Sequence, residues 1–282
     1  MRTQYGVPYM GSKTKMAETI ISKLPSGNRF VDLFGGGFAM THCAMLSGKY
    51  NTFLYNDYNP DIVQLVRDAY NGKYNYKIFK PEFVTREIFQ AQKDTDPYIK
   101  YIWSFGNRGT GYLFGKDIEH LKHAAHDFVV FGKPSPELDP EQMKAVKSKD
   151  IRSRRMEFCR WAREHKKRLD IEQLQQLERL QQLERLQFST ASYTDYVYQD
   201  GDIVYCDPPY EATAGYTVGD FDSNAFYYWV ATRPYQVWFS CYKISRNFPM
   251  VYAKKVRGTL GGGKNAVENY EIIYTNRKIE RR

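Results

Sequence analysis

The sequence predicts an α/β protein built on a mostly parallel sheet, because short apolar runs alternate with helical patterns near the start of the chain. Residues 15–24 carry apolar side chains at helical spacing, and the apolar run 29–34 leads into three glycines, 35–37. A second apolar run, 52–55, precedes another helical pattern that starts at Pro60. This alternation favours parallel strand pairing, because parallel neighbours need a crossover connection that is usually a helix.

The helices of this region have recognisable ends. A turn signal at 25–28 ends the first helix, and the helix formers 38–46 follow the glycines. Asn59 is expected to cap a helix whose first position is Pro60, because asparagine accepts N–H bonds there and proline has no N–H to satisfy. The apolar positions at helical spacing are Ala17, Ile20, Ile21 and Leu24 in the first helix and Ile62, Leu65, Val66 and Ala69 in the last.

A long insertion is predicted to divide the α/β domain in two. The alternation stops after residue 70, and the following segment, 71–187, is polar, aromatic and basic. We therefore expect one domain made of residues 1–70 and 188–282, with 71–187 inserted between its halves. Strand patterns resume at 202–206, 236–241, 250–253 and 270–274.

The insertion ends in a low-complexity repeat, 172–187, in which Gln-Gln-Leu-Glu-Arg-Leu occurs twice in tandem. Its leucines recur every third residue, which moves around an α-helix by about 60° per step and forms no single apolar seam. This pattern favours a low-complexity helical expansion over a partner-binding helix.

The composition indicates a polyanionic partner, since the chain has a net charge of +9 and a pI of about 9.1. Residues 144–168 contain 11 Lys or Arg against 3 Asp or Glu, so this stretch is either a DNA-binding face or a solvated helix. The four cysteines lie far apart without a Cys-x-x-Cys pair, and no apolar run is long enough to cross a bilayer. We therefore expect a soluble cytoplasmic protein without disulfides.

The strongest local signal is Asp207-Pro208-Pro209-Tyr210, which directly follows the apolar run 202–206. Two prolines cannot continue a central strand, so the chain leaves the sheet at its carboxyl edge, where open α/β sheets bind ligands. A carboxylate, a proline carbonyl and an aromatic ring together suit a flat heterocycle that carries an amino group. A plain strand-ending turn is the alternative interpretation.

The first strand, turn and helix indicate a nucleoside cofactor. The glycines 35–37, which follow Asp32-Leu33-Phe34, allow a ligand to approach the backbone closely. Asp57, at the end of the second predicted strand, is placed to accept hydrogen bonds from ribose hydroxyls. Taken singly, the glycines are nearly as well explained by tight packing, and Asp57 by a turn.

Four segments, 9–13, 32–37, 56–57 and 207–210, together resemble the Dam-type DNA adenine-N6 methyltransferases, especially bacteriophage members, and they follow the order of that family. The resemblance implies a seven-stranded Rossmann-like methyltransferase sheet with an inserted target-recognition region. It also implies S-adenosyl-L-methionine as cofactor and double-stranded DNA as substrate, with Tyr9 and Lys13 at the methionine end of the cofactor and Asp57 at its ribose. The cofactor residues so implied are Tyr9, Lys13, Asp32, Phe34, Gly35, Gly36, Asp57 and Asp207, and the catalytic residues are Asp207, Pro208, Pro209 and Tyr210.

Adenine itself explains the chemistry that the resemblance implies, because the lone pair of its exocyclic nitrogen is delocalised into the ring. Hydrogen bonds from that amine to Asp207 and to the Pro208 carbonyl localise the lone pair and direct it at the sulfonium methyl group. The chain has no Pro-Cys dipeptide, so the cysteine nucleophile of cytosine-C5 methyltransferases has no counterpart. The adenine must be flipped out of the duplex, and Tyr210, Thr213 and Tyr216 are expected to receive it.

Residues 104–116 resemble the target-recognition hairpin of the family. Arg108 and Lys116 are expected to reach base edges or phosphates, and Tyr112 to wedge into the base stack. A plain glycine-rich hairpin is the alternative. Lys116 stands where GATC-specific members carry an arginine, which leaves the recognition sequence open, and Phe38 occupies the last position of the common Phe-x-Gly-x-Gly turn.

Two further patterns are expected to be structural. His120, His123 and His126 recur every third residue on a predicted helix but lack the ligand set of a zinc site, so no metal is expected. Residues 258–264 have the spacing of a phosphate-binding loop, but Asn265 replaces its Ser or Thr, which favours a flexible connection between strands. Two other functions stay open, an RNA adenine-N6 methyltransferase and a catalytically silent DNA-binding protein of the same fold.

Overall fold

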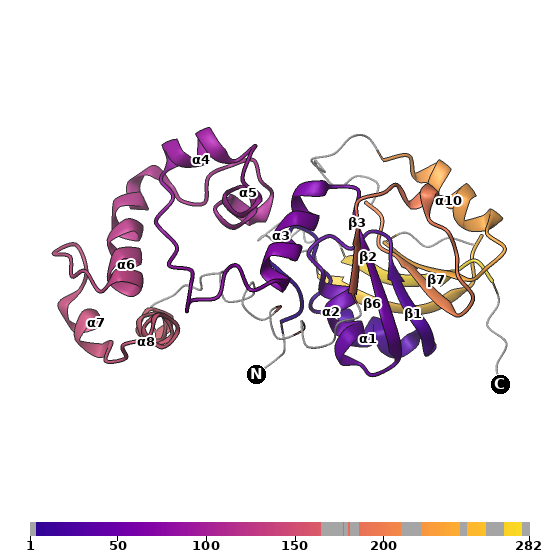
Figure 1. Cartoon of the computed structure of the whole chain (residues 1–282), viewed down its shortest axis with the longest axis horizontal. Helices are drawn as coiled ribbons and strands as arrows, with labels where there is room; N and C mark the ends of the chain where they lie inside the picture. The colour runs from indigo at the N-terminus through magenta and orange to yellow at the C-terminus, as the bar shows by residue number, and fades with distance from the viewer. Residues whose placement is uncertain are drawn as a thin grey trace. The chain divides into compact units, whose positions relative to one another are not determined.

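The computed structural model describes residues 4–164, 177, 180, 186–209, 221–242, 247–257 and 268–277. The chain divides into two compact units, and Figure 1 labels most of their helices and strands. Unit 1 consists of Met1–Val7, Gly11–Val63 and Gln182–Arg282, and unit 2 of Pro8–Met10 and Gln64–Gln181.

Unit 1 contains a sheet whose seven described strands follow the order β3-β2-β1-β4-β5-β7-β6. Strands β3, β2, β1, β4 and β5 run parallel, whereas β7 is antiparallel to both of its neighbours. The predicted α/β fold with a seven-stranded, mostly parallel, Rossmann-like sheet is thereby confirmed. The strand order reverses between β1 and β4, and such a switch point is where open α/β sheets bind ligands. The strands are β1 (Gly27–Asp32), β2 (Tyr50–Asn56), β3 (Leu186–Ser189), β4 (Asp202–Cys206), β5 (Val237–Cys241), β6 (Met250–Arg257) and β7 (Glu268–Thr275).

Helices cover both faces of this sheet. Val31 of β1 belongs to a core cluster that includes Phe226 and Val230 of helix α10. Its neighbour Asp32 points to the other face, where it accepts a hydrogen bond from Thr41 of helix α2. The two helices therefore lie on opposite faces, as expected for a parallel sheet. The helices of unit 1 are α1 (Ala17–Lys23), α2 (Ala39–Leu46), α10 (Ser223–Thr232) and the short 3-10 helix η4 (Tyr193–Asp195).

Helix α3 (Pro60–Tyr70) begins at the predicted residue, for the predicted reason. The side-chain oxygen of Asn59 accepts a hydrogen bond from the backbone N–H of Asp61 at 3.1 Å, which satisfies one of the donors that a helix start leaves unpaired. The helix spans the boundary between the two units, which falls after Val63.

Unit 2 is helical within its described residues. Asp96 and Asp139 cap α5 and α7, each of which starts with a proline. Val129 of α6, Leu138 and Phe158 of α8 form an apolar core cluster. In the part of the chain that the structure describes, no helix is long and apolar enough to span a membrane. The helices of unit 2 are α4 (Arg86–Gln92), α5 (Pro97–Ile102), α6 (Glu119–Phe131), α7 (Pro140–Ala145), α8 (Ile151–Glu164) and the short 3-10 helices η1 (Phe105–Asn107) and η2 (Lys116–Ile118).

The basic stretch 144–168 is only partly available for binding. Arg155 is buried, and its guanidinium donates a hydrogen bond to the hydroxyl of Tyr76 at 2.8 Å. Arg154 donates to the backbone carbonyl of Phe128. Part of the positive charge therefore stabilises unit 2 itself, whereas other residues of the stretch are exposed: Lys144, Lys147, Lys149, Arg152 and Arg160.

Two predicted features lie mostly or wholly outside the described residues. Of the repeat 172–187, the structure describes Leu177 and Leu180, which are both buried, and Leu186 and Gln187, which begin β3. The glycine-rich segment 258–264 is not described, but the strands on either side of it, β6 and β7, pair antiparallel.

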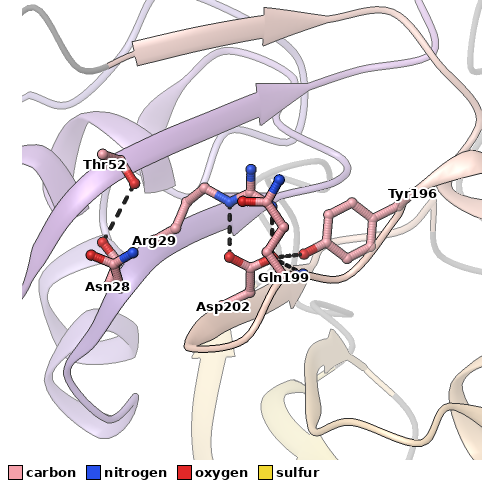
Figure 2. A network of polar contacts seen from close by, with 6 residues as sticks. All are labelled: Asn28, Arg29, Thr52, Tyr196, Gln199 and Asp202. Carbon is pink, nitrogen blue, oxygen red and sulfur yellow. Dashed lines mark hydrogen bonds and ion pairs between the residues drawn. The ribbon is translucent and has the colours of Figure 1, made fainter.

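A buried ion pair joins the starts of β1 and β4, as Figure 2 shows. Two nitrogens of the Arg29 guanidinium donate to the two carboxylate oxygens of Asp202 at 2.8 and 2.7 Å. Asp202 also accepts a hydrogen bond from the Tyr196 hydroxyl and another from the backbone N–H of Gln199. This end of the sheet is opposite to the carboxyl edge, so the network stabilises the strand pair without belonging to the predicted site.

Candidate active site

The ends of β1 and β4 bring two predicted site residues to the same edge of the sheet. Asp32 is the last residue of β1 and pairs in register with Tyr205 of β4. Asp207 follows Tyr205 by two residues, and the strand ends before it because two prolines come next. Pro208 is buried and Pro209 half-buried. This placement agrees with the position predicted for Asp207 at the carboxyl edge.

A buried lysine contacts the Asp207 carboxylate. Lys13 is only 7 % exposed, and its Nζ lies 3.1 Å from an Asp207 oxygen and 3.7 Å from a carboxylate oxygen of Glu271 on β7. The ring of Tyr242, which follows β5, lies 5.7 Å from the same nitrogen. Burial lowers the pKa of Lys13, but attraction to Asp207 and Glu271 outweighs it and raises the pKa above its ordinary value. Lys13 was expected at the methionine end of a cofactor. Glu271 and Tyr242 were not predicted to be part of the site.

Asp32 is a buried carboxyl group with one unsatisfied oxygen. Its Oδ2 accepts a hydrogen bond from the Thr41 hydroxyl at 2.8 Å, whereas Oδ1 has no hydrogen-bond partner among the residues that the structure describes. Burial is the main cause that raises the pKa of Asp32 to about 8. The neighbouring carboxylates Asp207 and Asp57 raise this pKa further, whereas the hydrogen bond from Thr41 lowers it. Asp32 is therefore mostly protonated at neutral pH. The Ser12 hydroxyl is another buried polar group without a hydrogen-bond partner in the described part of the chain.

The glycine turn is tied to the end of β2 by Asp57. One Asp57 oxygen accepts a hydrogen bond from the Gly36 N–H at 2.8 Å, and the other accepts from the Asn59 N–H at 2.9 Å. Burial raises the pKa of Asp57, and these two hydrogen bonds oppose the rise. A Cβ atom on Gly35 would lie 2.2 Å from the ring of Tyr55, so tight packing also demands a glycine at this position.

Asn56 was given no function from the sequence, but its side chain joins three segments of the chain through hydrogen bonds. Its amide nitrogen donates to the carbonyls of Leu33 and Ala191, and its amide oxygen accepts from the Ala191 N–H. A cavity of about 170 Å³ adjoins this side chain, and none of the predicted cofactor residues lines it. Other lining residues are Arg29, Ser189, Ser192, Asp195 and Tyr196.

The two phenylalanines of the glycine turn lie in different surroundings. Phe34 is half-buried and packs against the rings of Tyr193 and Phe226. Phe38 is fully buried and has a φ of +69°, a left-handed conformation that glycine adopts without strain. Phe38 also occupies the position where the family pattern has glycine. Its ring contacts those of Tyr55 and Phe188, so packing holds a strained residue in place.

The predicted recognition loop of unit 2 has a hairpin base. Ser104 and Tyr112 form an isolated antiparallel bridge, and the Phe105 N–H donates to the Gly111 carbonyl at 2.8 Å. Arg108 is half-buried and Lys116 exposed. Both therefore retain surface that a partner can contact.

Tyr112 belongs to the core of unit 2. It is 7 % exposed, its hydroxyl donates to the Val84 carbonyl at 2.6 Å, and the Arg86 guanidinium lies over its ring. A side chain that wedges between bases must be exposed, so the structure argues against the wedge predicted for Tyr112. The exposed aromatic residue of this loop is Phe105, with an exposed fraction of 71 %. Phe105 was not predicted as a contact, because nothing in the sequence distinguishes it from Tyr112 within the same glycine-rich segment.

The other predicted site residues are Tyr9, Tyr210, Thr213 and Tyr216. Tyr9 belongs to unit 2, where its ring meets that of Tyr101 edge to face at 5.3 Å. Tyr210, Thr213 and Tyr216 lie outside the described residues.

Two of the three histidines of α6, His123 and His126, have structural contacts. A ring nitrogen of His126 lies 2.7 Å from the Pro81 carbonyl, and the ring of His123 stacks on Phe83 at 4.4 Å. Among the residues that the structure describes, no group of three or more His, Cys, Asp or Glu is placed to hold a metal ion.

Comparison with known proteins identifies the family. The profile described as D12 class N6 adenine-specific DNA methyltransferase matches residues 9–127 and 144–271, which is most of the chain. This chain belongs to that family. It is also 23% identical over 242 residues to the retron Ec67 DNA adenine methylase of Escherichia coli, covering 81% of this chain and 71% of that protein. The matched residues include the glycine turn, Asp57, Asp207 and Glu271.

Asp32, the buried acid at the end of β1, makes the stability of the protein depend on pH. Between about pH 4 and pH 8 the folded protein keeps a proton on Asp32 that the unfolded chain has released. The free energy of unfolding therefore falls as pH rises through this window, by up to about 1.4 kcal/mol per pH unit. Asp32→Asn cannot ionise and keeps an acceptor for Thr41, so the variant should lose this slope.

Melting temperatures of the two proteins from pH 5 to pH 8 test this prediction. The variant should gain stability relative to the unsubstituted protein as pH rises. Parallel curves would show that Asp32 is already ionised in the folded protein.

Proposed function

We propose that this protein is a site-specific DNA methyltransferase that transfers the methyl group of S-adenosyl-L-methionine to N6 of an adenine flipped out of double-stranded DNA. The observation that carries the proposal is the Asp207 carboxylate, which is followed by two prolines at the carboxyl edge of β4 and contacts a buried lysine. The family supplies the reaction type, and Asp207 supplies the acceptor that this reaction needs at the amine.

The residues at this edge fit the proposed cofactor. Among the described residues, neither Asp32 Oδ1 nor the Ser12 hydroxyl has a hydrogen-bond partner, and a polar ligand relieves the cost of burying these polar atoms. Each Asp57 oxygen accepts one N–H and keeps a further lone pair for a ribose hydroxyl. When bound, the cofactor supplies a methyl group activated by a sulfonium. The proposed cofactor residues are Lys13, Asp32, Phe34, Gly35, Gly36, Asp57 and Asp207, and a role of Tyr9 stays a prediction.

The chemistry at the base requires hydrogen bonding and orientation. The adenine amine donates to the Asp207 carboxylate and to the Pro208 carbonyl, which localises the nitrogen lone pair for attack. Lys13 balances the charge of Asp207 in a site that largely excludes water. No covalent enzyme intermediate is needed. Pro209 shapes the turn, and the parts proposed for Tyr210, Thr213 and Tyr216 in receiving the flipped base rest on the family resemblance.

Unit 2 is proposed to bind DNA. Its basic stretch carries exposed lysines and arginines that suit phosphates, and Arg108 and Lys116 suit phosphates or base edges. Phe105 replaces Tyr112 as the proposed aromatic contact, because it is exposed on the same loop.

The direct test is methyl transfer from labelled S-adenosylmethionine to duplex DNA, with RNA of the same sequence as a parallel acceptor. Label in DNA adenine supports the proposal. Label in RNA alone would favour the RNA methyltransferase. Binding of DNA without methyl transfer or cofactor binding would favour a silent DNA-binding protein.

Neutralising part of the basic stretch should weaken DNA binding and flatten its dependence on salt. Lys147→Gln combined with Lys149→Gln removes two exposed charges. Each lost phosphate contact should reduce the slope of log affinity against log salt by about 0.9. Fluorescence anisotropy of a labelled duplex over a range of salt concentrations measures this slope.

A matched control is the pair Lys77→Gln and Lys80→Gln, which are exposed lysines of unit 2 outside the basic stretch. Equal slopes for both double variants would mean that residues 144–168 form only a solvated face.

A further inference from the structure

Glu271 is a buried carboxylate that no sequence motif singles out. Its side chain is 4 % exposed, and an oxygen lies 3.7 Å from the Nζ of Lys13. Buried carboxylates are costly unless they are paired, so a glutamate held in this position is bound to a specific partner. Among the described residues, one such partner is the ammonium that contacts Asp207 at 3.1 Å.

The sheet explains how Glu271 reaches this ammonium. Strand β7 runs antiparallel to β5, and Ile272 pairs with Cys241, the last residue of β5. Glu271 therefore lies at the carboxyl end of β5, beside the position where Tyr242 leaves the strand. On its other side β7 pairs with β6, where Glu271 lies opposite Lys254. A residue in the interior of a paired strand has a fixed backbone, which makes Glu271 a rigid anchor.

The carboxylates that contact Lys13 outnumber its single positive charge. One ammonium faces two carboxylates, Asp207 and Glu271, and the Tyr242 ring. Asp32, the further acid near Asp207, is mostly protonated at neutral pH. The ammonium is therefore shared between two anions instead of being held by Asp207 alone.

We infer that Glu271 is a positioning residue for methyl transfer: it draws the Lys13 ammonium toward β7, so that Asp207 is held by the lysine and still keeps acceptor capacity for the adenine amine. The inference rests on the proposed function of Asp207. Without the Glu271 charge, nothing on β7 competes with Asp207 for the Lys13 ammonium, and the Asp207 carboxylate loses part of its capacity to accept the amine.

Glu271→Gln tests this role, because the amide keeps the shape and removes the charge. The turnover rate should fall roughly 10- to 100-fold, while the affinity for DNA stays unchanged. Loss of Glu271 also lowers the pKa of Lys13, because one of the charges that raise it is removed while burial still lowers it. The alkaline limb of the turnover rate should therefore move to lower pH, and Glu271→Asp, which restores the charge, should recover part of both effects.

Asp202→Asn is the matched control. It also removes a carboxylate from a buried ion pair of unit 1, with Arg29, but at the opposite end of β4. It should lower the melting temperature and leave the turnover rate and its pH profile unchanged. A Glu271→Gln protein with an unsubstituted rate and profile would overturn the inference, as would a loss of rate no larger than that of Asp202→Asn at equal stability.

A second measurement needs no enzyme activity. Trace labelling with acetic anhydride across a pH series, read by mass spectrometry, reports the protonation of Lys13. Glu271→Gln should make Lys13 reactive at lower pH than in the unsubstituted protein, and an identical pH dependence would overturn the inference. If the unsubstituted protein transfers no methyl group, the proposed function fails, and the labelling still decides whether Glu271 controls Lys13.

Discussion

Replacing Asp207 by asparagine is expected to lower the rate of methyl transfer by roughly 10²- to 10³-fold, the usual effect of losing one preorganised group that stabilises developing charge. The amide cannot supply the anionic acceptor that the adenine amine needs, although it has nearly the same shape. Incorporation of labelled methyl groups at saturating cofactor and DNA measures the effect.

The fold should survive this change. Lys13 keeps Glu271 as an anionic partner, so the buried ammonium is not left alone. Circular dichroism should match that of the unsubstituted protein, and calorimetry should still detect cofactor binding. A variant that transfers methyl groups at close to the normal rate would rule out Asp207 as the acceptor and would leave the strand-ending turn as its role.

Substitutions of Phe38 should have the largest effect on stability, and they separate packing from backbone strain. Phe38 is fully buried, so truncation to alanine should cost about 3–5 kcal/mol. Its φ of +69° adds strain of roughly 1–2 kcal/mol for any residue with a Cβ, and glycine avoids this strain because it has no Cβ. Phe38→Gly should therefore be less destabilised than Phe38→Ala by about 1 kcal/mol, although both are less stable than the unsubstituted protein.

Urea unfolding of the three proteins decides between these contributions. If Phe38→Gly were no more stable than Phe38→Ala, the left-handed conformation would carry no strain in the folded chain. If Phe38→Gly were as stable as the unsubstituted protein, the contacts of the ring with Tyr55 and Phe188 would contribute nothing.

Most of the sheet could be predicted, because its signals are local. The run before Asp32, the glycines after it and the capped start of α3 depend on neighbouring residues only, and the structure contains all three. Strand β3 was missed: Leu186–Ser189 is short and overlaps the end of the leucine repeat, so no alternation of its own marks it.

The recognition loop shows a second reason why the sequence alone predicts only part of the site. The segment around residues 104–116 was predicted as a hairpin, and an isolated bridge joins Ser104 to Tyr112. Which of its aromatic residues faces solvent depends on what packs beneath the loop. Arg86 and the Val84 carbonyl hold Tyr112 in the core and leave Phe105 exposed, and neither is a neighbour in sequence.

The sequence by itself determined the α/β fold, the position of Asp207 after β4 and the family. These features depend on apolar strand runs, a proline pair and the order of motifs, all of which can be recognised without knowing which distant residues become neighbours. Only the tertiary structure decided that Lys13 meets Asp207 and Glu271, and that Asp32 is buried and protonated. The physical reason is that ion pairs and pKa values depend on which distant strands become neighbours. The antiparallel return of β7 beside β5 brings a glutamate from near the end of the chain to a lysine near its start.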